Sequence, residues 1–210
     1  MTEAENRHHP LDGLKGTSGR PRIGVLAIQG NYASHAQALA EAGAEPVEVR
    51  KAGELAALDA LVLPGGESTT MLLFLEKHRF FEELQRFCGA KPVFGTCAGA
   101  ILLAREVLNP PQRSLGLLDA TVERNAYGRQ IDSAIVTAET CLPGGPLEMV
   151  FIRAPRIVST GPSVELLARR DGFPTLIRQG KILAATFHPE LSRDRRVHKL
   201  FVDSVVAATL

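Results

Sequence analysis

The chain has 210 residues and a mass of 22.6 kDa, a size that fits one domain or two small ones. Hydrophobic residues make up 45% of it and charged residues 22%, which excludes a disordered chain and is ordinary for a packed core. The formal net charge of +1 and the absence of tryptophan argue against a basic nucleic-acid-binding face with stacking aromatic side chains.

The first half of the chain predicts alternating strands and helices. Short apolar runs that end in turns indicate buried strands at residues 23–28, 46–49, 61–63 and 92–96. Apolar residues at helical spacing, with capping or glycine stop signals, predict helices at residues 32–42, 68–77, 80–88 and 98–107. Because strands linked through helices pair in parallel, this order predicts a three-layer α/β fold, with a mostly parallel central sheet between helices on both faces.

The second half is richer in strands. Short runs predict strands at residues 120–124, 133–138, 149–153, 156–159, 173–178 and 182–187. The last two flank Gln179 and Gly180 and predict a hairpin, and residues 194–208 predict a final helix. We expect a single domain over residues 22–210 after a flexible, polar extension over residues 1–21, in which His8 and His9 are more consistent with solvated side chains than with a metal site.

Cysteine usage and hydropathy indicate the compartment. Three cysteines cannot all pair within one chain, which argues against a disulfide-stabilised fold and favours a reducing compartment, here the cytoplasm. No apolar run approaches the roughly 20 residues needed to cross a bilayer, and the N-terminus lacks the apolar centre of a signal peptide. We therefore expect neither a membrane nor nucleic acid as a partner, and no metal or cofactor.

Cys97 lies in the segment GTCAG (95–99), between an apolar strand and an apolar helix. A side chain on such a sharp turn sits in strained backbone, and its small neighbours let the chain approach itself closely. The turn also places the sulfur at a helix N-terminus, where the helix dipole favours the thiolate. We interpret Cys97 as a nucleophile, although on this pattern alone a small buried cysteine is an equally good interpretation.

A cysteine nucleophile needs a base, and His188 is the best placed of the six histidines. It follows a predicted strand within FHPE (187–190), and in an extended chain residues i and i+2 point to the same side. Glu190 can then orient His188, so that Cys97, His188 and Glu190 act as nucleophile, base and orienting acid. Taken alone, a histidine at a strand end is more often an ordinary turn residue.

The remaining histidines of the folded region are poorer candidates for the base. His35 and His78 are predicted on helices without a carboxylate at comparable spacing, and we expect His198 on the solvent side of the last helix. None of these three therefore enters the predicted site.

A second glycine-containing turn opens a helix at LPGGES (63–68). Glycines there allow backbone N–H groups to approach a developing oxyanion, and the N–H groups of Gly66 and Ala98 would form a two-donor oxyanion hole. Such a loop can instead bind phosphate, but neither GxGxxG nor GxxxxGK[ST] is present. All three segments follow strands, so we expect them to meet at one edge of the sheet, where open α/β folds place their sites.

Motifs along most of the chain resemble a known family. PGGEST (64–69), FGTCAG (94–99) and FHPE (187–190) are similar to the class I, triad-type glutamine amidotransferases, which have a flavodoxin-like fold. Longer motifs resemble the glutaminase subunits of pyridoxal 5'-phosphate synthase: AIQGN (27–31), LPGGESTTM (63–71), VERNAYGRQ (122–130), FIRAP (151–155) and FHPEL (187–191). The resemblance runs in order from about Ile23 to the C-terminus, while residues 141–146 match less well.

The resemblance implies hydrolysis of L-glutamine to L-glutamate and ammonia through a thioester on Cys97, with His188 as base and Glu190 as its partner. It places the glutamine-binding residues at Gly66, Glu67, Ser68, Arg124, Ile152 and Arg153. A zwitterionic amino acid suits these positions, because arginine binds a carboxylate and glutamate binds an ammonium group.

The resemblance also implies a partner, a synthase subunit that uses the ammonia to build pyridoxal 5'-phosphate (vitamin B6) from a pentose phosphate and a triose phosphate. The family assembles up to twelve glutaminases on twelve synthase subunits, and the synthase activates the glutaminase. Gln29, at the end of the first strand, lies in a motif that the family places near the partner surface.

Two other classes of function stay open on the sequence. Another cysteine hydrolase on the same architecture, of peptidase or deglycase type, would use the same nucleophile without an amino-acid pocket. A non-catalytic interaction subunit would carry the site as a relic, which the intact cysteine, histidine and glutamate argue against. Ammonia release from L-glutamine separates these possibilities.

Overall fold

The computed structural model describes residues 19–124, 126 and 133–209, and within them a seven-stranded sheet forms the centre of the molecule. In spatial order its strands are β10 (Glu165–Arg170), β11 (Phe173–Gln179), β12 (Ile182–Ala185), β4 (Val93–Thr96), β3 (Ala60–Leu63), β1 (Arg22–Leu26) and β2 (Glu45–Val49). The strands from β12 to β2 pair in parallel, and β11 pairs antiparallel with both β10 and β12. The predicted mostly parallel sheet is confirmed.

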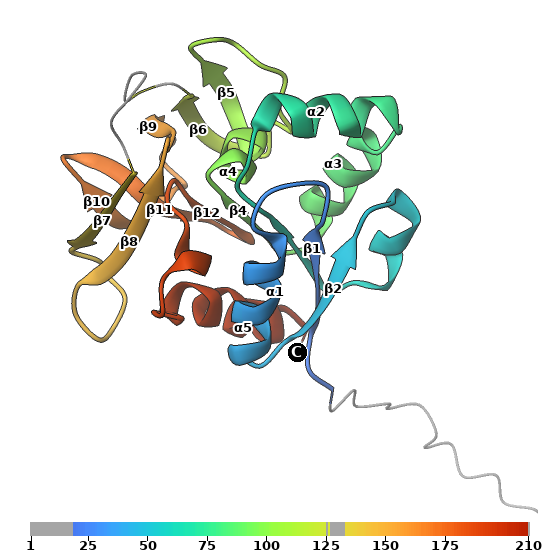
Figure 1. Cartoon of the computed structure of the whole chain (residues 1–210), viewed down its shortest axis with the longest axis horizontal. Helices are drawn as coiled ribbons and strands as arrows, with labels where there is room; N and C mark the ends of the chain where they lie inside the picture. The colour runs from blue at the N-terminus through green and yellow to red at the C-terminus, as the bar shows by residue number, and fades with distance from the viewer. Residues whose placement is uncertain (1–18, 125, 127–132, 210) are drawn as a thin grey trace, which may run out of the picture.

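Helices cover both faces of this sheet, as predicted (Figure 1). On one face, α1 (Tyr32–Glu41) and α5 (Arg196–Thr209) contact each other. On the other face lie α2 (Ser68–Lys77), α3 (Phe81–Ala90) and α4 (Ala98–Leu103). Alternate side chains of β3 supply the two cores: Leu61 and Leu63 pack with α2, α3 and α4, whereas Ala60 and Val62 pack with α1 and α5.

Smaller elements complete the fold beside the central sheet. The strands β5 (Ala104–Leu108), β6 (Leu118–Glu123) and β9 (Arg156–Thr160) form a second sheet, and β7 (Ser133–Ala138) pairs antiparallel with β8 (Leu147–Ile152). Short 3₁₀ helices, η1 (Ala52–Ala57) and η2 (Pro189–Leu191), follow β2 and β12. Apolar residues of β8 join the core under α5, so β8 lies against the face that carries α1.

The helix predicted at residues 98–107 is wrong in its second half. The helix α4 ends at Leu103, and the next residues form β5. Every residue of α4 is buried, so a continuation would carry the charged side chains of Arg105 and Glu106 into the core. The strand instead leaves both of them exposed.

The sequence also missed β10, whose charged residues suit the edge of the sheet. The hairpin at Gln179 and Gly180 is confirmed by the antiparallel pair β11–β12, although β12 ends at Ala185. Most of the predicted extension, with His8 and His9, lies outside the described residues. Within the part of the chain that the structure describes, no helix is both long and apolar enough to cross a membrane.

Candidate active site

Cys97 lies on the turn between β4 and α4, with φ of 48° and ψ of −103°. This positive φ is strained for a residue with a side chain, and the surrounding fold holds it in place. The chain does approach itself here, because a Cβ atom added to Gly99 would overlap the carbonyl oxygen of Leu63. Cys97 itself is 5% exposed.

His188 and Glu190 form a hydrogen-bonded pair beyond the end of β12, with 2.7 Å between His188 Nδ1 and Glu190 Oε1. The predicted pairing is therefore present, but its predicted cause is wrong. Residues 189–191 form the 3₁₀ helix η2 and not an extended chain, and this turn brings the carboxylate back to the imidazole. The backbone N–H of His188 also donates to Val150 on β8.

The charges of the pair are tied to Cys97. Burial by itself would lower the pKa of His188, but hydrogen bonds to Cys97 and Glu190 outweigh it and raise the pKa to about 10. Burial would likewise raise the pKa of Glu190, and the hydrogen bond with His188 lowers it to about 2 instead. At neutral pH the site therefore holds a glutamate carboxylate beside an imidazolium that contacts the cysteine.

A cavity of about 240 Å³ opens at the carboxyl ends of the parallel strands, next to Cys97 and His188. Small-molecule sites commonly measure about 300–1,000 Å³, so this one suits a ligand as small as an amino acid. The predicted residues that line it are Gly66, Glu67, Ser68, Cys97, Arg124, Ile152, Arg153 and His188. Ala98 and Glu190 do not line the cavity and are buried.

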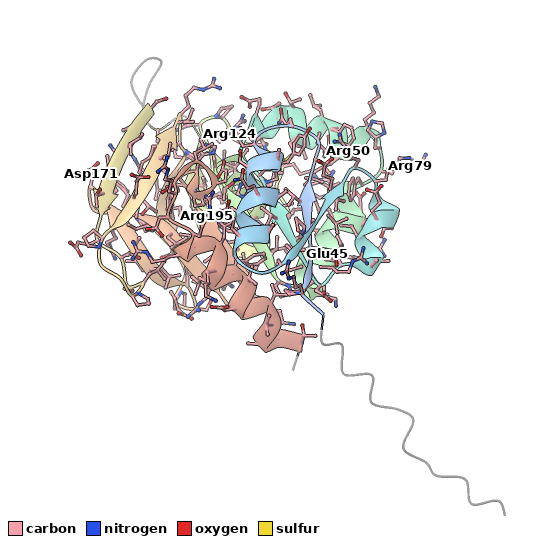
Figure 2. All side chains as sticks on the ribbon, turned by 60° about the horizontal axis from the view of Figure 1, so that its bottom comes forward. Glu45, Arg50, Arg79, Arg124, Asp171 and Arg195 are labelled. Atoms are coloured by element: carbon pink, nitrogen blue, oxygen red, sulfur yellow. The ribbon has the colours of Figure 1, made fainter. Side chains whose placement is uncertain are left out.

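Charged side chains of both signs border the cavity. Arg124 Nη2 donates to Thr69 Oγ1 over 2.7 Å and lies 3.3 Å from Glu67 Oε1. Arg124 lies at the same end of the molecule as Arg50, which follows β2, and away from Glu45, where β2 begins (Figure 2). This is the end to which the parallel strands point.

Two further predicted residues are held by side-chain hydrogen bonds. Ser68 donates to Gln112 over 2.9 Å, and the side-chain amide of Gln29 donates to the carbonyl of Glu67. Gln29 thereby lies against the glycine-containing loop. Four other residues line the cavity and were not predicted: Gly30, Asn31, Gly65 and Ile101. Of these, Gly65 packs so closely that an added Cβ would overlap the ring of His188.

His35 and His198, which were set aside as candidates for the base, both lie in the core, so the prediction that His198 faces the solvent is wrong. Both side chains are fully buried, and His35 Nε2 lies 3.3 Å from Glu190 Oε2. His198 faces the core from α5 and not the solvent. A signal was present in the sequence, since each histidine stands three and four residues before apolar residues of the same helix and so belongs to its buried stripe.

The two buried histidines should make the protein sensitive to mild acid. Burial lowers the pKa of His35 from its ordinary 6.5 to about 4 and that of His198 to about 3. The unfolded chain therefore binds protons that the folded protein excludes, so the free energy of unfolding falls as the pH drops below 6.5. Each histidine should contribute up to about 1.4 kcal/mol per pH unit, measured by urea unfolding between pH 7 and pH 4.

Two variants test whether His198 contributes to this pH dependence of the free energy of unfolding. His198→Leu should reduce it by about 1.4 kcal/mol per pH unit. His78 is exposed, so His78→Gln should leave the slope unchanged. An unaltered slope in His198→Leu would show that His198 is not neutral in the folded protein.

These features together define a class. A strained cysteine on a strand-to-helix turn, paired with a histidine and a carboxylate at the carboxyl edge of a parallel sheet, is typical of triad hydrolases that use a cysteine nucleophile. A model of the SNO glutamine amidotransferase family matches residues 25–207. The chain belongs to this family.

Curated relatives and solved structures agree with this assignment. The chain is 59% identical to the pyridoxal 5'-phosphate synthase subunit PdxT of Koribacter versatilis over 184 residues, which cover 88% of this chain and 95% of that protein. It is 50% identical to PdxT of Thermotoga neapolitana, covering 88% and 99%. A crystal structure of a glutamine amidotransferase matches with a TM-score of 0.81 and 45% identity, covering 88% and 98%.

A more distant structure shares the fold alone. PurLQS from Thermotoga maritima matches with a TM-score of 0.66 at 19% identity, covering 91% of this chain and 100% of that one.

Proposed function

We propose that this chain is the glutaminase of a two-component pyridoxal 5'-phosphate synthase, which hydrolyses L-glutamine to L-glutamate and ammonia. The observation that carries the proposal is the meeting of Cys97 and His188, with Glu190 hydrogen-bonded to His188, at one small cavity bordered by arginine and glutamate. Membership of a glutamine amidotransferase family and high identity to PdxT proteins support it.

The chemistry is acyl transfer in two halves. The thiolate of Cys97 attacks the side-chain amide carbon, and the imidazolium of His188 gives its proton to the nitrogen as the C–N bond breaks and ammonia leaves. His188, now neutral, takes a proton from water as that water attacks the thioester. The C–S bond then breaks, L-glutamate leaves, and the thiolate and imidazolium are restored.

The remaining predicted residues bind and stabilise the substrate. The backbone N–H groups of Gly66 and Ala98 hold the oxyanion of each tetrahedral intermediate. Arg124 and Arg153 bind the α-carboxylate of glutamine, and Glu67 binds its α-ammonium group. The ion pair between Arg124 and Glu67 favours this assignment, because it places opposite charges at the cavity where a zwitterion needs them. Ser68 and Ile152 complete the walls.

The proposal includes a partner and a location. The relatives are named as subunits of pyridoxal 5'-phosphate synthase, so we propose that a synthase subunit receives the ammonia. The complex would contain up to twelve copies of each chain. Gln29, beside the glycine-containing loop, is the residue that we assign to the partner-facing side.

Residues 22–210 act as a single domain. A cytoplasmic location suits the three free cysteines, one of which must stay reduced.

Reconstitution tests the proposal. The chain mixed with a pyridoxal 5'-phosphate synthase subunit should release ammonia and glutamate in equal amounts from L-glutamine, and pyridoxal 5'-phosphate should form from the two sugar phosphates. L-Asparagine, one methylene shorter, is the matched control and should release far less ammonia. Failure to release ammonia from L-glutamine in the complex, or cleavage of peptides at a comparable rate, would overturn the assignment.

A further inference from the structure

Two buried imidazoles stand behind the carboxylate of Glu190, on the side away from His188. His35 on α1 and His198 on α5 are both 0% exposed, and 3.1 Å separates His35 Nδ1 from His198 Nε2. Both rings pack edge-on against Phe94, with ring centroids 6.2 Å and 5.8 Å from it. Polar rings in an apolar setting cost stability, so packing alone does not account for them.

His35 touches two segments of the active site at once. Its Nε2 lies 3.1 Å from Thr96 Oγ1, the residue directly before Cys97, and 3.3 Å from Glu190 Oε2. Among the described residues Glu190 Oε2 has no well-aligned hydrogen bond. The other carboxylate oxygen is used by His188, with Asn31 at 3.4 Å. A single ring nitrogen of His35 therefore faces both the nucleophile turn and the free side of the carboxylate.

The contacts select one tautomer for the histidine pair. If His198 Nε2–H donates to His35 Nδ1, then His35 carries its proton on Nε2, which faces Thr96 and the negative Glu190. His198 Nδ1 is then a bare acceptor, and it is the atom that lacks a partner among the described residues. The opposite arrangement would turn a lone pair of His35 toward the carboxylate and bury an N–H of His198 without an acceptor, which is worse at both ends.

The neighbourhood keeps both rings neutral. Burial lowers the pKa of His35 to about 4 and of His198 to about 3, so neither carries charge at pH 7. The charged groups that act on them are Glu190 and His188 from the strand-end turn and Arg195, the residue directly before α5. A neutral N–H dipole orients a carboxylate without pairing its charge, so Glu190 stays available to His188.

We propose that His35 is a positioning residue for glutamine hydrolysis: its Nε2–H, held in that tautomer by His198, fixes the carboxylate of Glu190 and the turn that carries Cys97. The inference rests on the proposed glutaminase function. It adds His35 on α1 and His198 on α5 to the groups that support the triad. These two helices contact each other on the face of the sheet opposite α2, α3 and α4 (Figure 1). Substrate does not reach His35, which does not line the cavity.

Two amides of nearly equal polarity provide the test. In His35→Gln the amide nitrogen can reach the position of Nε2 and keep the contacts with Glu190 Oε2 and Thr96 Oγ1. In His35→Asn it reaches only the position of Nδ1, so the contact with His198 survives and the contact with Glu190 is lost. With the synthase subunit present, His35→Asn should lower kcat for L-glutamine about 10- to 100-fold with KM unchanged, and His35→Gln should stay within about threefold of wild type.

The pH profile separates positioning from a merely structural role. Without a fixed Glu190 the pKa of His188 falls, so the alkaline limb of kcat/KM should move to lower pH in His35→Asn and stay in place in His35→Gln. The inference would be overturned if kcat fell equally in the two variants. It would also be overturned if His35→Asn kept both the wild-type kcat and the wild-type alkaline limb of kcat/KM. Wild-type protein without any glutaminase activity would instead contradict the proposed function.

A spectroscopic measurement covers the case in which a variant does not fold. Histidine labelled with ¹⁵N in the wild-type chain reports the tautomer from the chemical shifts of Nδ1 and Nε2. At pH 7, His35 and His198 should both be neutral with the proton on Nε2. A proton on Nδ1 of His35 would overturn the inference without any substitution at this position.

Discussion

Cys97→Ala should abolish ammonia release from L-glutamine while leaving the fold intact. Removal of a triad nucleophile costs on the order of 10⁶-fold in kcat in a serine protease, so the variant should show no measurable activity. Alanine keeps the Cβ atom on the turn with φ of 48°, so the free energy of unfolding should change little. With the synthase subunit present, pyridoxal 5'-phosphate should still form when an ammonium salt replaces glutamine, which shows that only the glutaminase step is lost.

The other two described cysteines serve as controls. Cys141 is exposed, and Cys141→Ser should keep full activity. Burial raises the pKa of Cys88 to about 12, so iodoacetamide should leave Cys88 unmodified while it alkylates Cys141 and inactivates the enzyme at Cys97. Measurable glutamine hydrolysis by Cys97→Ala in the complex would contradict the thioester mechanism.

Glu190→Gln should produce the second largest loss. The amide keeps the size of the side chain but removes the charge that holds His188 protonated and oriented, and the corresponding change in a serine protease triad costs about 10⁴-fold. We expect a fall in kcat of about 10²- to 10⁴-fold with little change in KM, because Glu190 does not line the cavity. The alkaline limb of kcat/KM should shift to lower pH, since the pKa of about 10 at His188 depends in part on this carboxylate.

The matched control is Glu148 on β8. The Glu148 carboxylate accepts a hydrogen bond of 2.8 Å from Ser192, which is close in sequence to Glu190. Glu148 is exposed, however, and does not line the cavity. Glu148→Gln should leave kcat and the pH profile unchanged. A loss in Glu148→Gln as large as in Glu190→Gln would show that the whole turn, and not the Glu190 carboxylate, supports the activity.

Short-range patterns were enough to find Cys97, His188, Glu190 and the loop at Gly66, whereas the glutamine-binding residues, Arg124 and Arg153 among them, were implied only by the family resemblance. The sequence around Cys97 predicts a sharp strand-to-helix turn because glycines on both sides permit a close backbone approach, and the structure has that turn. The carboxyl ends of parallel strands meet at one edge, so β3, β4 and β12 bring their loops together as expected. For the same reason Cys97 and His188 could be predicted to meet although 91 residues separate them.

Local reasoning failed where a segment's environment decided its structure. The apolar run after Cys97 favours a helix, but the point at which α4 ends depends on how deeply it is buried and on whether charged residues can reach solvent. Glu190 was paired with His188 for the wrong reason, because a strand pattern cannot reveal the 3₁₀ turn that Pro189 begins.

The tertiary structure alone placed His35 and His198. Each sits on a helix whose stripe of buried residues is visible in the sequence, yet nothing local says that the two stripes meet over Phe94 and beside Glu190. Contacts that span 155 residues or more, such as those from His35 to Glu190 and to His198, arise from the packing of α1 against α5 and η2. Sequence therefore predicts the residues that we propose to react, because their chemistry needs special local backbone. The groups that we propose to orient them come from helix packing, which depends on the whole fold.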